Sequence, residues 1–212
     1  MNFNRLATLS QKFLVFNKNI LKTLEKRPDV LNSNIKYWLK QKKIIGLKNG
    51  FYVLADRYYR AGNKDIYLEY IANQLVAPSY LSVEYVLAKS QILSEPVNAL
   101  TSVTTKTSRG KINDLGSFRY YSLSPRLFSG YKIKYYQGAP VYEAEKPKAL
   151  FDFLYLRFLR RQPINAKALE ALRFNWENIS ATDFKQAEKY LKFTNSRRLL
   201  DLFRLIKEKY YA

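Results

Sequence analysis

Residues 32–54 read NSNIKYWLKQKKIIGLKNGFYVL and join a helical pattern to a hairpin pattern. Apolar residues recur at helical spacing, so one side of the segment 32–43 faces a core. The residues that carry this spacing are Leu31, Ile35, Trp38 and Leu39. Two β-rich runs then flank Asn49-Gly50, a pair that tolerates the positive φ angles of a tight hairpin. The stretch therefore predicts a helix followed at once by a short hairpin.

The residues upstream predict two further helices. Phe3–Leu14 is amphipathic, and Asn17 is a suitable N-cap for a helix over residues 18–27. Pro28-Asp29 is expected to stop that helix before the next begins near Asn32. Two short helices separated by a Pro-containing turn, the second followed by a hairpin, match a winged helix-turn-helix. We expect this unit to occupy residues 1–60.

The charge of this region indicates a nucleic-acid partner. Residues 1–64 hold 14 Lys and Arg against 3 Asp and Glu, whereas residues 65–144 hold 8 against 6. Clustered cations favour phosphate neutralisation and counterion release on double-stranded DNA. We expect Asn34 and Tyr37 nearest the bases, Lys36 and Lys40 at phosphates, and Lys48 on the wing. The full predicted DNA-binding set is Ser33, Asn34, Lys36, Tyr37, Lys40, Lys43, Lys48 and Asn49. The competing interpretations are a protein-interaction module and excess lysine that only solubilises the chain.

Composition excludes several classes of chemistry. The chain of 212 residues is 47% hydrophobic, carries a formal net charge of +20, and contains neither cysteine nor histidine. Disulfides, thiol nucleophiles, histidine acid–base catalysis and zinc ribbons are therefore excluded. We expect no cofactor, no metal ligand set and no catalytic residues. The sequence shows no signal peptide pattern and no apolar stretch of membrane-spanning length, so we expect a cytoplasmic protein.

Residues 61–212 predict a second domain of mixed composition. A helix is expected over 65–76 and another after Ser82, followed by short strands of an antiparallel sheet. The predicted strands are 100–105, 118–123, 131–135 and 140–142. Lys148–Arg161 is apolar nearly all round and predicts a buried helix, and amphipathic helices at 165–172, 180–192 and 196–210 form a C-terminal cap. The predicted class is α+β: a winged helix-turn-helix, a mixed α/β domain with antiparallel strands, and a helical end.

The order of motifs resembles the AbiEi-type antitoxin family. The segments that carry the resemblance are Lys48-Asn49-Gly50-Phe51-Tyr52-Val53, Pro78-Ser79-Tyr80-Leu81-Ser82, Val103-Thr104-Thr105, Phe128-Ser129-Gly130-Tyr131 and Lys148-Ala149-Leu150-Phe151-Asp152. They span about the first three-quarters of the chain. The resemblance implies a transcriptional regulator of a type IV toxin–antitoxin or abortive-infection system. Its winged helix would repress the operon, and its C-terminal domain would counter a neighbouring nucleotidyltransferase toxin.

Other functions remain open at this stage. A standalone repressor needs no toxin partner. A metal-dependent nuclease would use Glu143, Glu145, Lys146 and Lys148. The usual carboxylate-x-Lys motif would need a carboxylate at position 144 or 146, where Ala144 and Lys146 stand. Tyr131–Tyr135 alternates lysine with aromatic residues, which is typical of a half-buried strand and also of a face that stacks on bases. Arg197, Arg198 and Arg204 either contact a toxin or its RNA, or only face solvent.

Overall fold

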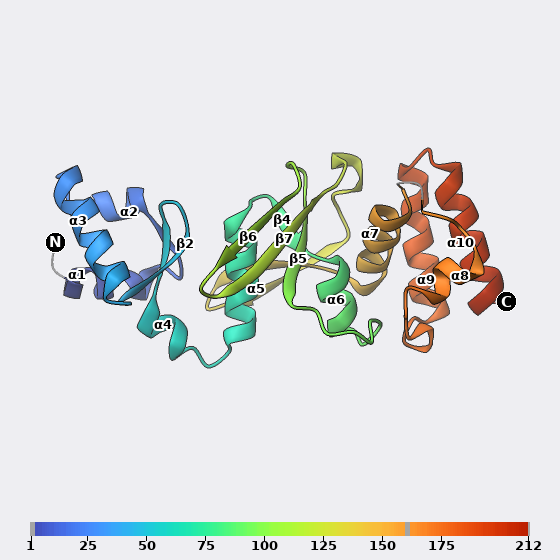
Figure 1. Ribbon diagram of the computed structural model, residues 1–212, viewed down its shortest axis with the longest axis horizontal. Coiled ribbons are helices and arrows are strands. Elements are labelled where there is room, and N and C mark those ends of the chain that lie inside the picture. The colour runs from blue at the N-terminus through green and yellow to red at the C-terminus, as the bar shows by residue number, and fades with distance from the viewer. Residues whose placement is uncertain (1–2, 160–161, 212) are drawn as a thin grey trace.

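The computed structural model describes residues 3–159 and 162–211, apart from the side chains of Leu9 and Ser10. The helices are α1 (Phe3–Lys12), α2 (Lys18–Lys22), α3 (Pro28–Lys40), α4 (Ala55–Tyr59), α5 (Lys64–Leu75), α6 (Val83–Lys89), α7 (Lys146–Phe158), α8 (Ala166–Glu170), α9 (Ala181–Glu188) and α10 (Arg197–Tyr210). The strands are β1 (Phe16–Asn17), β2 (Ile44–Lys48), β3 (Phe51–Leu54), β4 (Ser79–Leu81), β5 (Ala99–Thr104), β6 (Arg109–Asn113), β7 (Gly116–Ser122), β8 (Tyr131–Tyr136) and β9 (Ala139–Ala144). The protein is of mixed α and β class, and Figure 1 shows its elements laid out along one long axis.

The N-terminal unit consists of α1 to α3 and a small antiparallel sheet of order β1-β3-β2. Its own core buries residues from every element, among them Leu6, Leu31, Ile35 and Trp38. Asn17 caps α2 as predicted, because its side chain accepts a hydrogen bond of 2.9 Å from the Ile20 amide.

The start of α3 corrects one prediction. Pro28 was expected to end the preceding helix, but α2 already ends at Lys22 and Pro28 opens α3. Proline suits the first position of a helix because its missing N–H has no partner there and its φ is already helical. The helix thus starts four residues before Asn32.

A six-stranded sheet forms the centre of the molecule, in the order β6-β7-β5-β4-β9-β8. The prediction of a purely antiparallel sheet is wrong for two pairings, because β5 runs parallel to β7 and β4 parallel to β9. Strands β4 and β6 were not predicted. Helix α5 packs against one face of the sheet, and α6 and α7 lie toward the C-terminal side (Figure 1).

The N-terminal unit and the sheet share one apolar core. Leu14, Ile45 and Val53 belong to the same buried cluster as the residues of α5 and the large sheet. The first half of the predicted connector of residues 55–64 forms α4, whose Ala55 and Tyr58 are buried. The division into residues 1–60 and 61–212 stays a prediction, and the core is continuous across it.

The C-terminal part agrees closely with the elements predicted from the sequence. Helix α7 is buried on nearly all sides, as the apolar run predicted, and it ends at Phe158; the predicted residues 160 and 161 lie outside the described part of the chain. Ser180 and Asp183 form the predicted capping box at the start of α9. Figure 1 shows α8, α9 and α10 packed together beyond α7.

Candidate nucleic-acid interface

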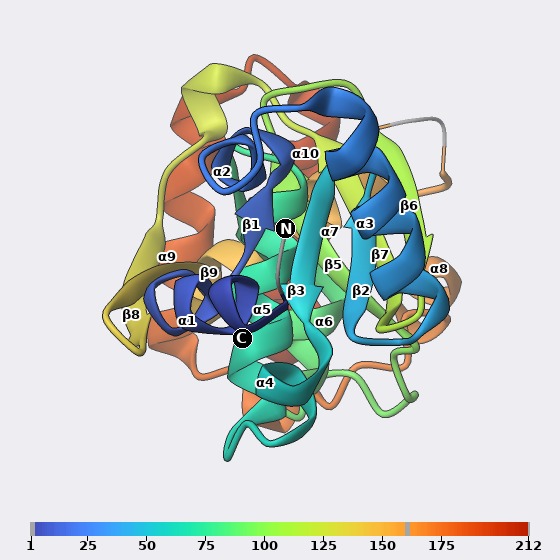
Figure 2. The same ribbon diagram turned by 90° about the vertical axis from the view of Figure 1, so that its left-hand side faces the viewer.

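Helix α3 presents one polar stripe to solvent. Leu31, Ile35 and Trp38 fill the core side. On the opposite side four predicted DNA contacts are exposed with helical spacing, and these are Ser33, Lys36, Tyr37 and Lys40. Tyr37 keeps 54% of its surface exposed. Figure 2 looks onto this end of the molecule and shows α3 beside β2, with its outer side open.

Asn34 does not belong to this stripe. It is only half exposed, and its amide nitrogen is buried without a hydrogen-bond partner. The predicted role of Asn34 in reading bases is therefore not supported by its position. Asn34 lies three residues after Leu31 and four before Trp38, so the helical spacing of these two core residues is the signal that places Asn34 at the border of the buried side.

Lys43 and two aromatic side chains lie beside the polar stripe of α3. The Lys43 ammonium lies 4.7 Å from the centre of the Phe3 ring and 5.9 Å from that of Tyr37. Such cation–π contacts hold the ammonium near the stripe while leaving its charge available to an anion. Lys43 therefore extends the basic stripe of α3 toward α1.

The hairpin tip is not free to reach DNA as a wing. The Lys48 ammonium donates to the carbonyl oxygens of Gln74 and Leu75 at 3.4 and 2.8 Å. Burial lowers the pKa of Lys48, and Lys111 and Lys106 lower it further. Asn113, at the end of β6, donates a hydrogen bond of 3.0 Å to the Leu47 carbonyl. The predicted wing contact of Lys48 is thus corrected; Asn49 remains exposed at the turn.

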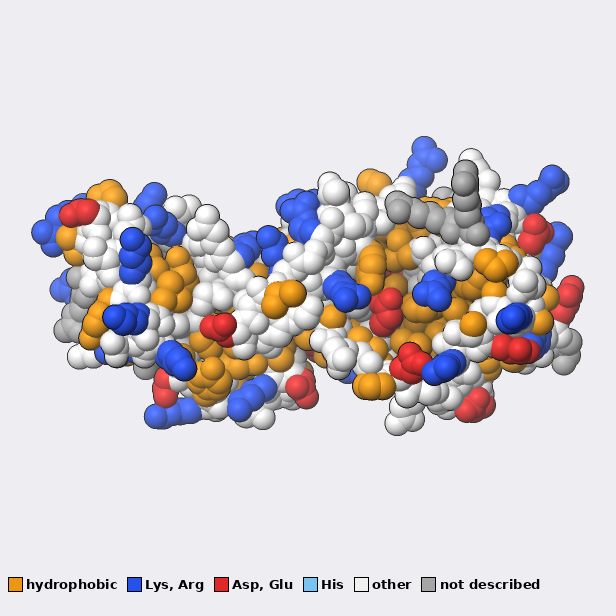
Figure 3. Space-filling view, in the orientation of Figure 1, with side chains coloured by type: hydrophobic (Ala, Val, Ile, Leu, Met, Phe, Trp, Pro, Cys, Tyr) orange, Lys and Arg blue, Asp and Glu red, His pale blue; other side chains and the backbone are white. Residues whose placement is uncertain are grey.

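The stripe lies in the most basic part of the chain. Figure 3 shows Lys and Arg side chains over the N-terminal end, where residues 1–64 contribute a net charge of +11. Asp29, in the first turn of α3, is exposed on the same side. Lysines at Lys36, Lys40 and Lys43 outnumber this single carboxylate, so the surface favours an anionic partner.

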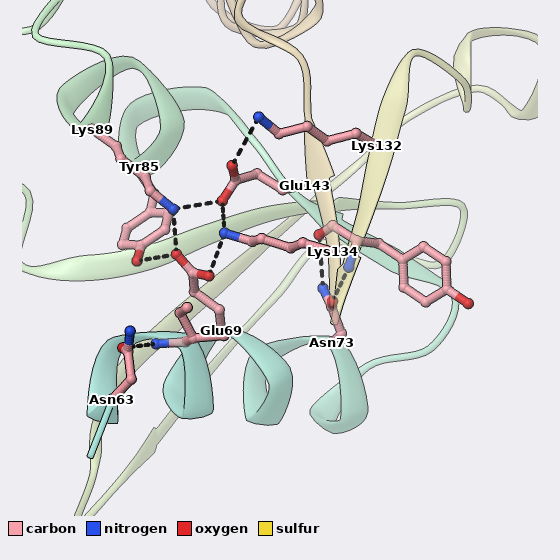
Figure 4. A network of polar contacts seen from close by, with 10 residues as sticks. Asn63, Glu69, Asn73, Tyr85, Lys89, Lys132, Lys134 and Glu143 are labelled. Atoms are coloured by element: carbon pink, nitrogen blue, oxygen red, sulfur yellow. Dashed lines mark hydrogen bonds and ion pairs between the residues drawn. The ribbon is translucent and has the colours of Figure 1, made fainter. Parts of the chain in front are cut away.

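A second polar cluster lies between α5, α6 and the edge of the sheet (Figure 4). Glu69 and Glu143 are buried, and Lys89 bridges them at 2.7 and 2.8 Å. Lys134 lies 2.6 Å from Glu69 and 2.5 Å from Glu143; its contact with Glu69 is close enough for an ion pair but lacks hydrogen-bond geometry. Burial raises the pKa of Glu143, but hydrogen bonds from Lys134 and Lys89 lower it by more than burial raises it. The pKa of Glu143 therefore lies below its ordinary value. The cluster joins α5, α6, β8 and β9 as an ion-pair network.

The residues considered for a nuclease do not come together. Glu143 belongs to the network, whereas Glu145 is exposed. Lys146 pairs with Asp183 at 2.5 Å. Lys148 is fully buried and pairs with Asp152, which also accepts hydrogen bonds from Tyr80 and Ser82. Across the described residues no group of three or more metal-ligating side chains forms.

The lysine and aromatic side chains of β8 face opposite sides of the sheet. Lys132 and Lys134 point toward the network, and Ile133 and Tyr135 are 50% and 69% exposed on the other face. A base-stacking face with interleaved lysines is therefore not formed.

The C-terminal arginines differ from one another: Arg197 and Arg204 are exposed, but the Arg198 side chain donates to the Phe158 carbonyl at 2.8 Å. Arg198 thus has a structural contact in place of the predicted partner contact.

Comparison with known proteins adds no relative. No protein-family model matches the chain, and a search of curated proteins gives no match. None of the helices in residues 3–159 and 162–211 is long and apolar enough to cross a bilayer.

Proposed function

We propose that the chain is a DNA-binding transcriptional regulator that acts as the antitoxin of an AbiE-like type IV toxin–antitoxin system. The observation that carries the DNA-binding part is the exposed stripe of Ser33, Lys36, Tyr37 and Lys40 on α3. The three helices and the sheet of order β1-β3-β2 support reading the N-terminal unit as a winged helix-turn-helix. In this proposal α3 enters the major groove, and the hairpin serves to fasten α3 to the rest of the protein.

The toxin-directed part rests on the resemblance of the motif order. Arg197 and Arg204 remain exposed on α10, among the C-terminal helices. These two side chains are the proposed contacts to a nucleotidyltransferase toxin or its RNA. A standalone repressor is the alternative, and it differs only in lacking this second activity.

Fluorescence anisotropy on the chain's own promoter tests DNA binding. The full-length protein should bind this duplex more tightly than a random one, and a Lys36→Ala/Lys40→Ala double variant should lose most of both affinities. Lys185→Ala, an exposed change on α9, is the matched control. Equal binding by the double variant and the control would refute the α3 interface.

Growth rescue tests the antitoxin part separately. The gene encoded beside this one is expressed from an unrelated promoter together with the Lys36→Ala/Lys40→Ala variant. Rescue by this DNA-binding-deficient protein would support direct antitoxin action. Rescue only by the unaltered protein would mean that antitoxin action depends on DNA binding. A harmless neighbouring gene would support the standalone repressor.

A further inference from the structure

A groove opens on the face of the sheet that is turned away from α5. Tyr120 marks the α5 face, since its hydroxyl donates to the Ala72 carbonyl at 2.7 Å. Side chains alternate along a strand, so Arg119 and Tyr121 point to the opposite face. Two cavities of about 400 and 390 Å³ meet there. The residues common to both linings are Glu84, Tyr121, Phe153 and Arg157.

We call this the Glu84 groove. Figure 3 looks onto it and shows a hollow with hydrophobic walls, an acidic side chain inside it and basic side chains beside it. The groove is distant from the α3 stripe, because it lies where the sheet meets α6, α7 and α8. It belongs to none of the surfaces described above.

Glu84 has an unused hydrogen-bonding capacity. One carboxylate oxygen accepts a long hydrogen bond of 3.5 Å from the Tyr121 hydroxyl. The other oxygen, Oε2, is buried and has no hydrogen-bond partner. A carboxylate oxygen withdrawn from water without a donor is costly, so the site favours a ligand that brings a donor.

The backbone holds Glu84 in place. Val83 has a φ of +53°, a strained value for a β-branched residue. The hydroxyl of Thr101 accepts a hydrogen bond of 2.9 Å from the Tyr85 amide and donates one of 2.7 Å to the Ser82 carbonyl. This side chain fixes the first turn of α6 to β5, so the backbone at Glu84 is held at the edge of the groove.

Two arginines line the same groove and leave Glu84 unpaired. Arg119 and Arg157 are exposed, and within the described part of the chain neither forms an ion pair with Glu84. Burial and Glu84 raise the pKa of Tyr121, whereas Arg119 lowers it, and the net effect is a raised pKa. Tyr121 therefore stays protonated between an acidic and a basic group. The groove offers separate acceptor and anion-binding ends.

We propose that the Glu84 groove binds a nucleotide unit whose base carries an exocyclic amino group. The amino group donates to Glu84, and the phosphate binds Arg119 and Arg157, whose planar guanidinium groups match phosphate oxygens. Tyr121 and Phe153 supply aromatic surface for the base. An aromatic amino acid fits less well, because its ammonium and carboxylate share one carbon, whereas the acidic and basic groups here are farther apart than an ion pair.

Calorimetric titration of the full-length protein with CMP and UMP tests the proposal. The two nucleotides differ at C4, an amino group in CMP and a carbonyl oxygen in UMP, and at N3, which carries a proton only in UMP. CMP should bind at least about tenfold more tightly, since a carbonyl oxygen facing Glu84 removes a hydrogen bond to a charged group. AMP and GMP, which also carry amino groups, should likewise bind more tightly than UMP. A 5′-phosphorylated dinucleotide identifies the source: tighter binding than CMP indicates an RNA or DNA end, and equal binding a free nucleotide.

Three variants locate the site. Glu84→Gln should weaken CMP by about tenfold and leave UMP nearly unchanged, because it keeps the side-chain shape and removes the charge. Arg157→Ala should weaken both nucleotides alike. Arg60→Ala, at the C-cap of α4 and outside the groove, removes another exposed arginine and should change neither. Thermal melting checks the fold of each, and the comparison of CMP with UMP needs no variant.

The proposal is overturned by any of three results. These are no saturable binding of the four nucleotides, equal affinities for CMP and UMP, and binding of inorganic phosphate or phenylalanine as tight as that of CMP. Failure here leaves the α3 interface intact, since that surface is tested on DNA with different variants.

Discussion

The ammonium of Lys48 lies 2.8 Å from the carbonyl oxygen of Leu75, the last residue of α5. The C-terminal end of a helix carries partial negative charge and unpaired carbonyls, so a lysine there is stabilised. The same ammonium lies 4.5 Å from the centre of the Phe51 ring. The β2–β3 hairpin is thereby fastened to the large sheet's helix.

Replacing Lys48 should affect stability and not DNA binding. Lys48→Met keeps the aliphatic stem but removes the donor to Gln74 and Leu75, and we expect a loss of about 1–2 kcal/mol in the free energy of unfolding. Urea unfolding measures this loss. The salt dependence of DNA binding should match that of the unaltered protein, with Asn49→Ala as the control at the same turn. A drop in the salt slope would mean that Lys48 reaches a phosphate after all.

Lys36 and Lys40 should behave in the opposite way. Each is exposed on α3, so Lys36→Ala and Lys40→Ala should leave urea unfolding nearly unchanged. Each should lower the slope of log affinity against log salt concentration by about one, on specific and random duplexes alike. Asn34→Ala should alter base preference little, because its amide nitrogen is buried. A strong change at one base position for Asn34→Ala would restore its predicted role.

Local signals predicted much of the fold. The hairpin at Asn49-Gly50, the cap at Asn17 and the capping box of Ser180 with Asp183 all depend on residues close in sequence, and the structure has them. The sheet order could not be predicted, because parallel pairing of β5 with β7 depends on a connection through β6. Strand β6 itself, RGKIN, carries little of the β-branched signal.

The candidate surfaces were predicted less completely. The charge of residues 1–64 indicates the basic region, but the exposure of each side chain on α3 depends on its spacing from Leu31, Ile35 and Trp38. The sequence predicts partner contacts for Lys48 and Arg198, because a free side chain and one bonded to a distant carbonyl look the same in sequence. The Glu84 groove joins residues of α6, β7 and α7, which are distant in sequence, so no local pattern predicts it.

The buried pair of Lys148 and Asp152 should be costly to break. Burial lowers the pKa of Lys148, and burial raises that of Asp152 while Lys148 opposes the rise. Lys148→Met leaves Asp152 without its partner, and we expect a loss of about 3–5 kcal/mol in urea unfolding. The double change Lys148→Met/Asp152→Asn removes both charges yet keeps an acceptor for Tyr80 and Ser82, so it should recover much of this loss. A double variant no more stable than the single one would contradict this account.

Strand β8 allows a test of the sheet register with two neighbouring prolines. The Glu145 amide donates to the Gly130 carbonyl, and the register continues with Lys132 opposite Glu143 and Ile133 opposite Tyr142. Lys132 is therefore in a hydrogen-bonded pair, whereas the N–H of Ile133 points to the open edge. Lys132→Pro should cost about 3 kcal/mol or more and Ile133→Pro much less. A larger loss for Ile133→Pro than for Lys132→Pro in urea unfolding would place the register one residue away.

The ion-pair network of Glu143 should make stability depend on pH in the acid range. The folded-state pKa of Glu143 lies below its ordinary value of 4.5, because hydrogen bonds from Lys134 and Lys89 outweigh the effect of burial. A depressed pKa means that the carboxylate contributes stability above about 4.5, and that this contribution is lost as the pH falls through the lower folded-state pKa. Urea unfolding of the unaltered protein and of Glu143→Gln should therefore differ most at neutral pH and converge at low pH. Glu177→Gln, an exposed change, should show no such convergence. A difference that widens on acidification would mean that Glu143 is protonated in the folded protein and that the lysines do not hold its charge.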